Sequence, residues 1–254
     1  MVDQVTTGVL PDLPPRRSER LSAAVVRDLV ELIVTGEIAE GDLLAPEGPL
    51  SEHFGVSRTV IREAMKRLEE KGLVVVAQGR GTQVARSGTW NVLDPTVLTA
   101  LIDNDESLGV LDELTIVRGN LESAMAGTVA AQRKPEELTR IEHALAAMRE
   151  MQHESDAFRQ ADVVFHFTVM ELSRNRLAEN IAKNLYRRAL ESARYHGIGY
   201  EDAFRSTLDE HALVVEAIAN QDVSGAEDAM RDHILGSWQR RRYETTGGAT
   251  VVDP

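Results

Sequence analysis

The chain has 254 residues, no cysteine and a formal net charge of −13. The length allows two domains that each bury a core, and the lack of cysteine excludes disulfides and thiolate metal sites. With no long apolar run and no signal-peptide core at the N-terminus, we expect a cytoplasmic protein that makes no contact with a membrane. Residues 1–88 hold 11 basic and 13 acidic side chains, so most of the acidic excess lies further along. A nearly neutral first domain can still present a basic face to nucleic-acid phosphates.

The first part of the chain predicts helices that are joined by a tight turn. Residues 1–17 are polar and contain prolines, which favours a disordered tail. Residues 18–35 have apolar side chains at helical spacing. Residues 50–73 then contain one helix, a turn at Gly55 and a second helix with Ser57 as its N-cap.

The second helix of this pair carries Arg58, Arg62 and Lys66 on the face opposite its apolar side chains. A recognition helix needs such a stripe, because its first turns reach base edges while flanking cations meet phosphates. Three basic residues alone fit an ordinary solvated helix equally well. The next residues favour DNA binding, because residues 73–84 predict a β-hairpin with a tight turn at residues 78–81, which would form a wing.

The segments VSRTVIREAMKRLEEKGLV and GRGTQV resemble the DNA-binding domain of GntR-type bacterial transcription regulators. The resemblance covers roughly residues 18–86 and implies a winged helix-turn-helix bound to double-stranded operator DNA. The family often has an arginine where this chain has Gly48. Because one winged helix covers one half-site, we expect a homodimer on an inverted repeat. The residues expected at DNA are Arg58, Thr59, Arg62, Lys66, Gly79, Arg80, Gly81 and Thr82.

The second part of the chain predicts an all-α domain. After a linker at residues 87–94, Asp94 is a good N-cap and Pro95 a good first helical residue. The fold class we expect is therefore mainly α, with a winged helix-turn-helix followed by an antiparallel helical bundle at residues 95–242 and a frayed tail at residues 243–254. The expected helices of the bundle are residues 95–104, 108–132, 135–152, 156–173, 175–195, 207–220 and 223–242.

Four polar side chains lie on apolar faces of these helices. Asp162 and His166 are four residues apart in one helix, and His211 and His233 share apolar stripes in two others. A single buried histidine usually has a neighbouring partner, but burying four such groups without a shared partner costs on the order of several kcal/mol. Three histidines and an aspartate suit a first-row divalent ion, with zinc expected first and nickel or manganese as alternatives.

The same residues resemble the metal-binding pattern of the FCD effector domain found in the FadR-type branch of the GntR family. The pattern has a D-x-x-x-H pair, here Asp162 and His166, then a histidine early in the penultimate helix and one in the last, here His211 and His233. The resemblance covers about residues 95–240. It implies that these four side chains ligate a divalent metal ion in an effector-binding domain.

Arg118 lies on an apolar stripe of the helix predicted at residues 108–132, where a guanidinium needs an anionic partner. It forms either a structural ion pair or a clamp for the carboxylate of a small effector, to which Asn184 and Tyr195 would add hydrogen bonds. Residues 90–94 resemble the linker of regulators of aldonate catabolism, so a sugar acid is the first candidate.

Three functions remain open at this point. We expect a repressor that a carboxylate effector releases from its operator. A regulator that senses the metal itself is the first alternative. An all-α metalloenzyme is the second, although the sequence has no HExxH motif and no obvious general base beside the four ligands.

Overall fold

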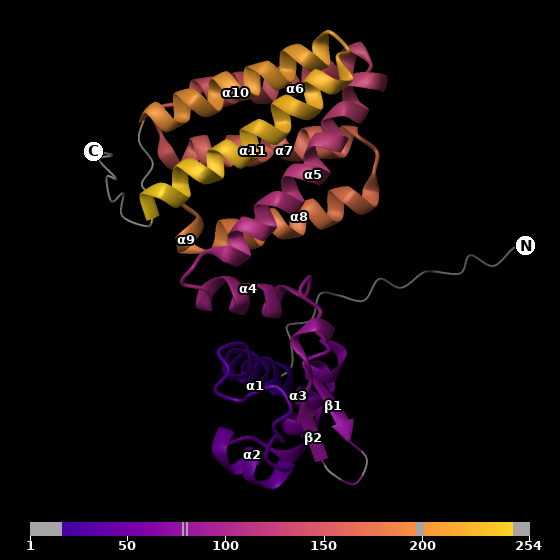
Figure 1. The fold of residues 1–254 in the computed structure, drawn as a ribbon, viewed down its shortest axis with the longest axis vertical. Coiled ribbons are helices and arrows are strands. Elements are labelled where there is room, and N and C mark those ends of the chain that lie inside the picture. The colour runs from indigo at the N-terminus through magenta and orange to yellow at the C-terminus, as the bar shows by residue number, and fades with distance from the viewer. Residues whose placement is uncertain (1–16, 78, 80, 197–200, 246–254) are drawn as a thin grey trace, which may run out of the picture. The chain divides into compact units, whose positions relative to one another are not determined.

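The computed structural model describes residues 17–77, 79, 81–196 and 201–245, and the chain divides into two compact units at residues 97 and 98. The fold is mainly α-helical, as predicted (Figure 1). Arg80 and most of both predicted tails lie outside the described residues. In the part of the chain that is described, no helix combines the length and the apolar character needed to cross a bilayer. The elements are α1 (Arg17–Val34), α2 (Glu47–Phe54), α3 (Arg58–Glu70), β1 (Val74–Ala77), β2 (Gly81–Val84), a 3₁₀ turn η1 (Ser87–Thr89), α4 (Pro95–Asn104), α5 (Gly109–Gln132), α6 (Pro135–Glu150), α7 (Ser155–Leu172), α8 (Arg176–Glu191), α9 (Ala193–His196), α10 (Glu201–Ala219) and α11 (Val223–Thr245).

The first unit contains the predicted helix-turn-helix, α2 and α3. Gly55 ends α2 with a left-handed φ of 62°, which glycine adopts without steric cost. Ser57 then caps α3, since its side chain accepts a hydrogen bond from the backbone N–H of Val60. Ile61 and Leu68 are fully buried on the inner face of α3, which packs against α1. The opposite face of α3 is therefore left for solvent or for a ligand.

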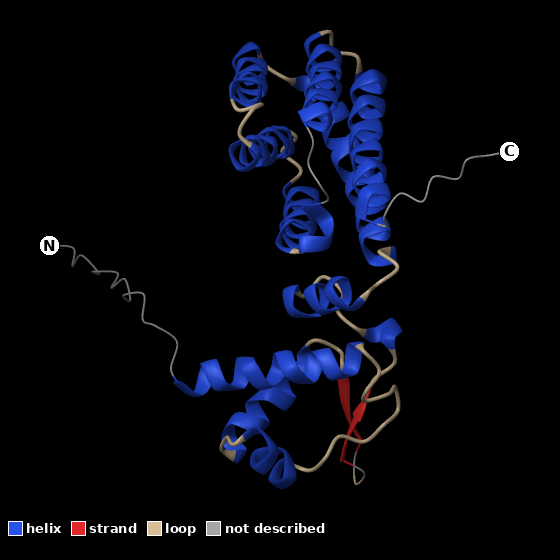
Figure 2. Ribbon diagram, turned by 90° about the vertical axis from the view of Figure 1, so that its left-hand side faces the viewer, coloured by secondary structure: helices blue, strands red, loops and turns tan. Residues whose placement is uncertain are grey.

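The predicted wing is an antiparallel hairpin, shown in red in Figure 2, that pairs Val74 with Val84 at its base. The segment between α1 and α2 lies along β2 as a further edge. Leu44 N–H donates to the Thr82 carbonyl (2.8 Å), and Val84 N–H donates to the Asp42 carbonyl (2.9 Å). These backbone bonds fix the base of the hairpin to the helical part of the unit.

The predicted linker is tied to the C-terminal end of α3. Lys71 forms an ion pair with Asp94, both mostly buried, and Asp94 also caps α4 by accepting from Thr96 N–H (2.9 Å). Gly72 has a φ of 72°, and a Cβ there would lie 2.3 Å from the Thr89 carbonyl oxygen. This close approach requires glycine. Asp94 is thus an N-cap, as predicted, but the segment before it is held by specific contacts with the end of α3.

The second unit is a helical bundle whose central helix is α5, in contact with α7, α8, α10 and α11. Figure 1 shows α5 and α11 crossing the bundle together. Because α5 has neighbours on several sides, its buried side chains extend around the helix instead of forming one stripe. The main core around it includes Val129, Ile141, Met148, Phe158, Phe165, Val169, Val214, Ile218 and Met230.

Several helix ends in this unit differ from the prediction. The helix predicted at residues 175–195 is two helices, because Ser192 is extended (φ −82°, ψ 127°) and separates α8 from α9. Serine weakens helices by offering the backbone alternative hydrogen bonds. α10 begins earlier than predicted, at Glu201, and α11 continues to Thr245, into the predicted tail. Apolar periodicity marks the buried part of a helix, so it misses end turns.

Candidate metal centre and DNA-binding face

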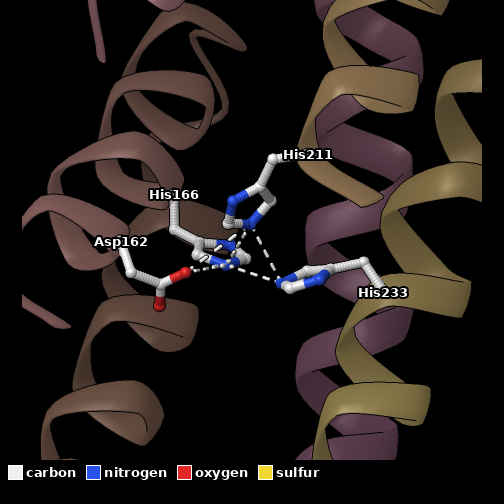
Figure 3. A group of neighbouring side chains, drawn as sticks. All are labelled: Asp162, His166, His211 and His233. Atoms are coloured by element: carbon white, nitrogen blue, oxygen red, sulfur yellow. Dashed lines mark hydrogen bonds and ion pairs between the residues drawn. The ribbon is translucent and has the colours of Figure 1, made fainter. Parts of the chain in front are cut away.

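Asp162, His166, His211 and His233 meet inside the bundle, as Figure 3 shows. Asp162 and His166 project from α7, one turn apart, while His211 comes from α10 and His233 from α11. One possible ligand atom from each of the four lies within 4.8 Å of the others. The three imidazoles are buried, and Asp162 is 17% exposed. Periodicity placed these residues on inner faces, and the bundle brings those faces together.

The three Nε2 atoms have the spacing of ligands around one ion. They are 3.0 Å apart for His211 and His233, 3.2 Å for His166 and His233, and 3.4 Å for His166 and His211. Two nitrogens at about 2.0 to 2.1 Å from one zinc ion lie about 2.8 to 3.4 Å apart at octahedral or tetrahedral angles. Asp162 Oδ1 is 3.7 Å from His211 Nε2 and 4.0 Å from His166 Nε2. The three imidazoles therefore have the spacing of ligands to one small divalent ion, and Asp162 lies slightly farther out beside them.

Two of the imidazoles are oriented by carboxylates. Glu122 Oε2 lies 2.6 Å from Nδ1 of His166, and Glu210 Oε2 lies 2.9 Å from Nδ1 of His233. A carboxylate in this position accepts the Nδ1 proton, so that the Nε2 lone pair faces the ligand. The lone pairs of His166 and His233 then point to a common centre. A cation held at that centre would stabilise the arrangement.

The other two donors are oriented in different ways. Tyr186 donates its hydroxyl proton to Asp162 Oδ2 (2.6 Å), which leaves Oδ1 on the side of the imidazoles. Oδ1 is buried without a hydrogen-bond partner among the described residues. His211 stacks on Phe165 with 4.2 Å between ring centroids, and its Nδ1 has no hydrogen-bond partner within the same ranges. Packing therefore orients His211.

Burial favours neutral imidazoles at this site. Burial holds the pKa of His211 well below its usual value, and His233 and His166 act in the same direction. Burial also lowers the pKa of His233, although the hydrogen bond to Glu210 opposes it. Burial would raise the pKa of Glu122, but the nearby Arg118 and then His166 outweigh it and hold this pKa at about 2. His211 and His233 are therefore neutral, as metal ligation requires, and the ionised Glu122 can accept the Nδ1 proton of His166.

Arg118 forms the ion pair that was one of its two interpretations. Its Nε donates to Glu122 Oε1 (2.7 Å), and the two side chains are 2% and 1% exposed. Its Nη1 donates to the Tyr195 hydroxyl (3.0 Å), and its guanidinium carbon lies 3.6 Å from the centroid of the Tyr186 ring. Arg118 and Tyr195 are therefore in contact, as a shared site would need. Asn184 lies on α8 and is partly buried, and its part in effector binding stays a prediction.

Sequence reasoning missed four residues of this site: Glu122, Tyr186, Glu210 and Arg240. Both oxygens of Glu210 accept from Arg240 at 2.8 Å. One signal was available, because Glu122 follows Arg118 by four residues and such pairs meet on a helix. Glu210 had no comparable signal, since it precedes His211 and points to a different side of α10.

The predicted recognition face is solvent-exposed on α3 and carries Arg58, Thr59, Arg62 and Lys66. Arg62 Nε lies 2.9 and 2.8 Å from the two oxygens of Glu47, with both side chains well exposed. This pair raises the pKa of Arg62, chiefly through the hydrogen bond that Arg62 donates to Glu47, so the guanidinium stays charged. Arg62 can therefore leave Glu47 and bind a phosphate or a base edge at little cost in free energy.

Other predicted DNA-binding residues lie at the tip of the hairpin, and Gly48 lies close to Arg58. Gly79 and Gly81 at the hairpin tip have φ values of 76° and 100°. Thr82 is half-buried beside them. A Cβ on Gly48 would lie 3.6 Å from Nη2 of Arg58. Where the family often has an arginine, this chain therefore has the guanidinium of Arg58 close by.

Comparisons with known proteins agree with this division of the chain. The family described as bacterial regulatory proteins, gntR family, matches residues 21–84, and the FCD domain matches residues 113–236. Over 223 residues the chain is 32% identical to the galactonate operon transcriptional repressor of Escherichia coli strain K12, which covers 87% of this chain and 96% of that protein. It is 29% identical over 211 residues to the HTH-type transcriptional regulator YieP of the same strain, with coverage of 82% and 90%.

A solved structure supports the fold. The structure of Lar, which controls expression of the Listeria monocytogenes agr system, matches with a TM-score of 0.55 and 15% sequence identity. The match covers 91% of this chain and 98% of that one. At this identity the likeness concerns the fold alone.

Proposed function

The chain belongs to the gntR family of bacterial transcription regulators and carries an FCD domain, and we propose that it is a repressor released from its operator by a small carboxylate bound at the metal cluster. Its relatives are DNA-binding regulators and not enzymes. The observation that carries the proposal is the convergence of Asp162, His166, His211 and His233 on one point inside the effector domain.

For DNA, the exposed stripe of α3 would enter the major groove. Arg58, Thr59 and Arg62 lie in its first turns, where side chains reach base edges, and Lys66 follows where a cation meets phosphates. The wing would contact the sugar-phosphate backbone of the DNA through Gly79, Arg80, Gly81 and Thr82. One such domain covers one half-site, so the proposed form is a homodimer on an inverted repeat.

For the metal, the chain's own residues do the positioning. Glu122 and Glu210 would hold the Nδ1 protons of His166 and His233, and Tyr186 would turn one oxygen of Asp162 toward the centre. A divalent ion held there would supply a Lewis-acidic centre that attracts carboxylate and hydroxyl oxygens. Imidazole and carboxylate ligands favour zinc, with nickel and manganese as alternatives.

For the effector, Arg118, Tyr195 and Asn184 are the proposed contacts. Because Glu122 already pairs with Arg118 through Nε, an effector carboxylate would share this guanidinium instead of replacing its partner. The relative named for the galactonate operon supports a sugar acid. Such a ligand would bridge several helices at once and so favour one packing of the bundle over another, which is how it can change DNA binding.

The first test is a thermal-shift screen of metal-loaded and chelator-treated protein against sugar acids, with elemental analysis of both. We expect about one ion per chain, and stabilisation by a sugar acid only when the ion is present. Operator binding that responds to the metal alone, with no response to any acid, would favour the metal-sensing alternative. A protein without bound metal that still responds to a sugar acid would contradict the proposed site.

A further inference from the structure

Glu210 connects the cluster to the surface of the bundle. Its Oε2 lies 2.9 Å from His233 Nδ1, and its two oxygens accept from Nη1 and Nη2 of Arg240 at 2.8 Å each. The exposed fraction rises along this row, from 4% for His233 to 25% for Glu210 and 37% for Arg240. Three side chains therefore form a continuous row from the buried imidazole to solvent.

The two helices α10 and α11 contribute to this row in alternation. Glu210 is next to the candidate ligand His211 on α10, so one short segment supplies both a ligand and the partner of another ligand. Arg240 follows His233 by seven residues, about two turns, on the same side of α11. Two residues of α11, His233 and Arg240, therefore contact Glu210. The bidentate contact with Arg240 restricts the carboxylate to a narrow range of orientations.

From this arrangement we propose that Glu210, held by Arg240, is a positioning residue for metal binding. It keeps the imidazole of His233 turned so that Nε2 faces those of His211 and His166. The inference rests on the proposed metal site, and it assigns a role to two residues outside the four ligands. Residues in this position commonly change metal affinity by about 10- to 100-fold when they are replaced.

A second carboxylate–arginine row, Arg118–Glu122–His166, has the same order of groups but is buried throughout. Removing Arg118 or Glu122 leaves its partner as an uncompensated charge in the core. The row through Glu210 is partly exposed, so it can be changed without that cost. Substitutions at Glu210 or Arg240 can therefore change the orientation of the His233 imidazole without a large loss of fold stability.

The test compares three variants of the full chain: Glu210→Gln, Arg240→Lys and the control Glu216→Gln, which changes an exposed carboxylate on the same helix. Zinc affinity is measured by competition with a chelator, and the melting temperature of each metal-free protein is recorded. We expect about 10- to 100-fold weaker zinc binding for Glu210→Gln, a smaller loss for Arg240→Lys, and wild-type affinity for Glu216→Gln. The visible absorption of the cobalt-loaded protein should change only in the first two.

The outcomes separate this inference from the proposed function. If wild-type protein binds no zinc or cobalt, the metal site itself is wrong. If it binds zinc and Glu210→Gln binds it equally well, with an unchanged cobalt spectrum, Glu210 and Arg240 form only an ion pair between helices and the inference is overturned. If Glu210→Gln cannot be purified, Arg240→Lys decides in the same way, because it keeps the carboxylate and both charges.

Discussion

Two arginine–glutamate ion pairs have nearly equal nitrogen–oxygen distances but lie in contrasting surroundings. Arg62 and Glu47 meet at 2.8 Å on the DNA-binding face, where their side chains are 69% and 39% exposed. Arg118 and Glu122 meet at 2.7 Å in the bundle, where they are 2% and 1% exposed. Water screens the first pair, so its partners can separate and bind other groups. The second pair is held by the core, because neither charge has water as an alternative partner.

This difference matches the two tasks that the halves of the chain are proposed to have. A DNA-binding surface needs cations that are fixed loosely and can move to phosphates and base edges. A ligand site needs groups whose positions are set before the ligand arrives. The following predictions test the contrast, starting with the largest effect.

Glu122→Ala should strongly destabilise the effector domain, by about 3 to 5 kcal/mol, because it leaves the buried guanidinium of Arg118 without its carboxylate. Chemical denaturation of the metal-free protein measures the effect. Glu47→Ala, which breaks the exposed pair, should leave the denaturation midpoint unchanged. The double variant Arg118→Met/Glu122→Leu should recover most of the loss, since apolar groups of similar size remove both charges. Equal denaturation midpoints for Glu122→Ala and Glu47→Ala would show that the buried pair matters no more for stability than the exposed one.

Arg62→Ala should weaken operator binding by about tenfold to a hundredfold if Arg62 contacts a base. Fluorescence anisotropy with labelled operator and with random DNA separates specific from general binding. Arg140 provides a matched control, since it is an exposed arginine paired with an exposed glutamate, Glu171, in the bundle. Arg140→Ala should bind operator normally. An Arg58→Ala/Arg62→Ala double variant with full operator affinity would refute the assignment of the recognition face.

Tyr195→Phe should weaken effector binding by about two- to tenfold, because it removes one hydroxyl beside Arg118 and leaves the buried ion pair intact. Calorimetric titration of the metal-loaded protein with a sugar acid measures this loss. The comparison variant is Tyr186→Phe. The hydroxyl of Tyr186 donates to Asp162, so its removal should weaken metal binding more than it weakens binding of the acid. A Tyr195→Phe protein with wild-type affinity for the acid would place the effector away from this side of Arg118.

Lys66→Ala should have the smallest effect, because a phosphate contact adds little sequence preference. We expect slightly weaker binding to operator and random DNA alike, and a salt dependence whose slope is shallower by about 0.9. Measurements at several salt concentrations give the slope. An unchanged slope would mean that Lys66 does not meet a phosphate.

The sequence predicted features that depend on local signals. Gly55 and Ser57 fix the turn before α3, and the spacing of Ile61 and Leu68 defines its buried face. In the same way, apolar neighbours on α7 placed Asp162 and His166 on an inner face. Local patterns suffice there because each depends on one element and its own period.

The features that were missed depend on how helices pack. Glu210 could be connected with His233 only after α10 and α11 were placed side by side, and Tyr186 with Asp162 only after α8 lay against α7. Glu122 was overlooked for another reason, since a glutamate is normally expected on the solvent side of a helix. The break at Ser192 was missed because the pattern of apolar residues continues across it.

The central claim is that a ligand at the buried cluster controls the exposed face of α3. The most direct measurement is operator affinity of metal-loaded protein with and without a sugar acid, for wild type and for His211→Ala/His233→Ala, paired with acid affinity in the presence and absence of operator. We expect the acid to weaken operator binding by wild type only, and operator to weaken acid binding by the same factor, as linkage requires. Equal release of wild type and the double variant by the acid, or operator binding by wild type that the acid does not change, would contradict the claim.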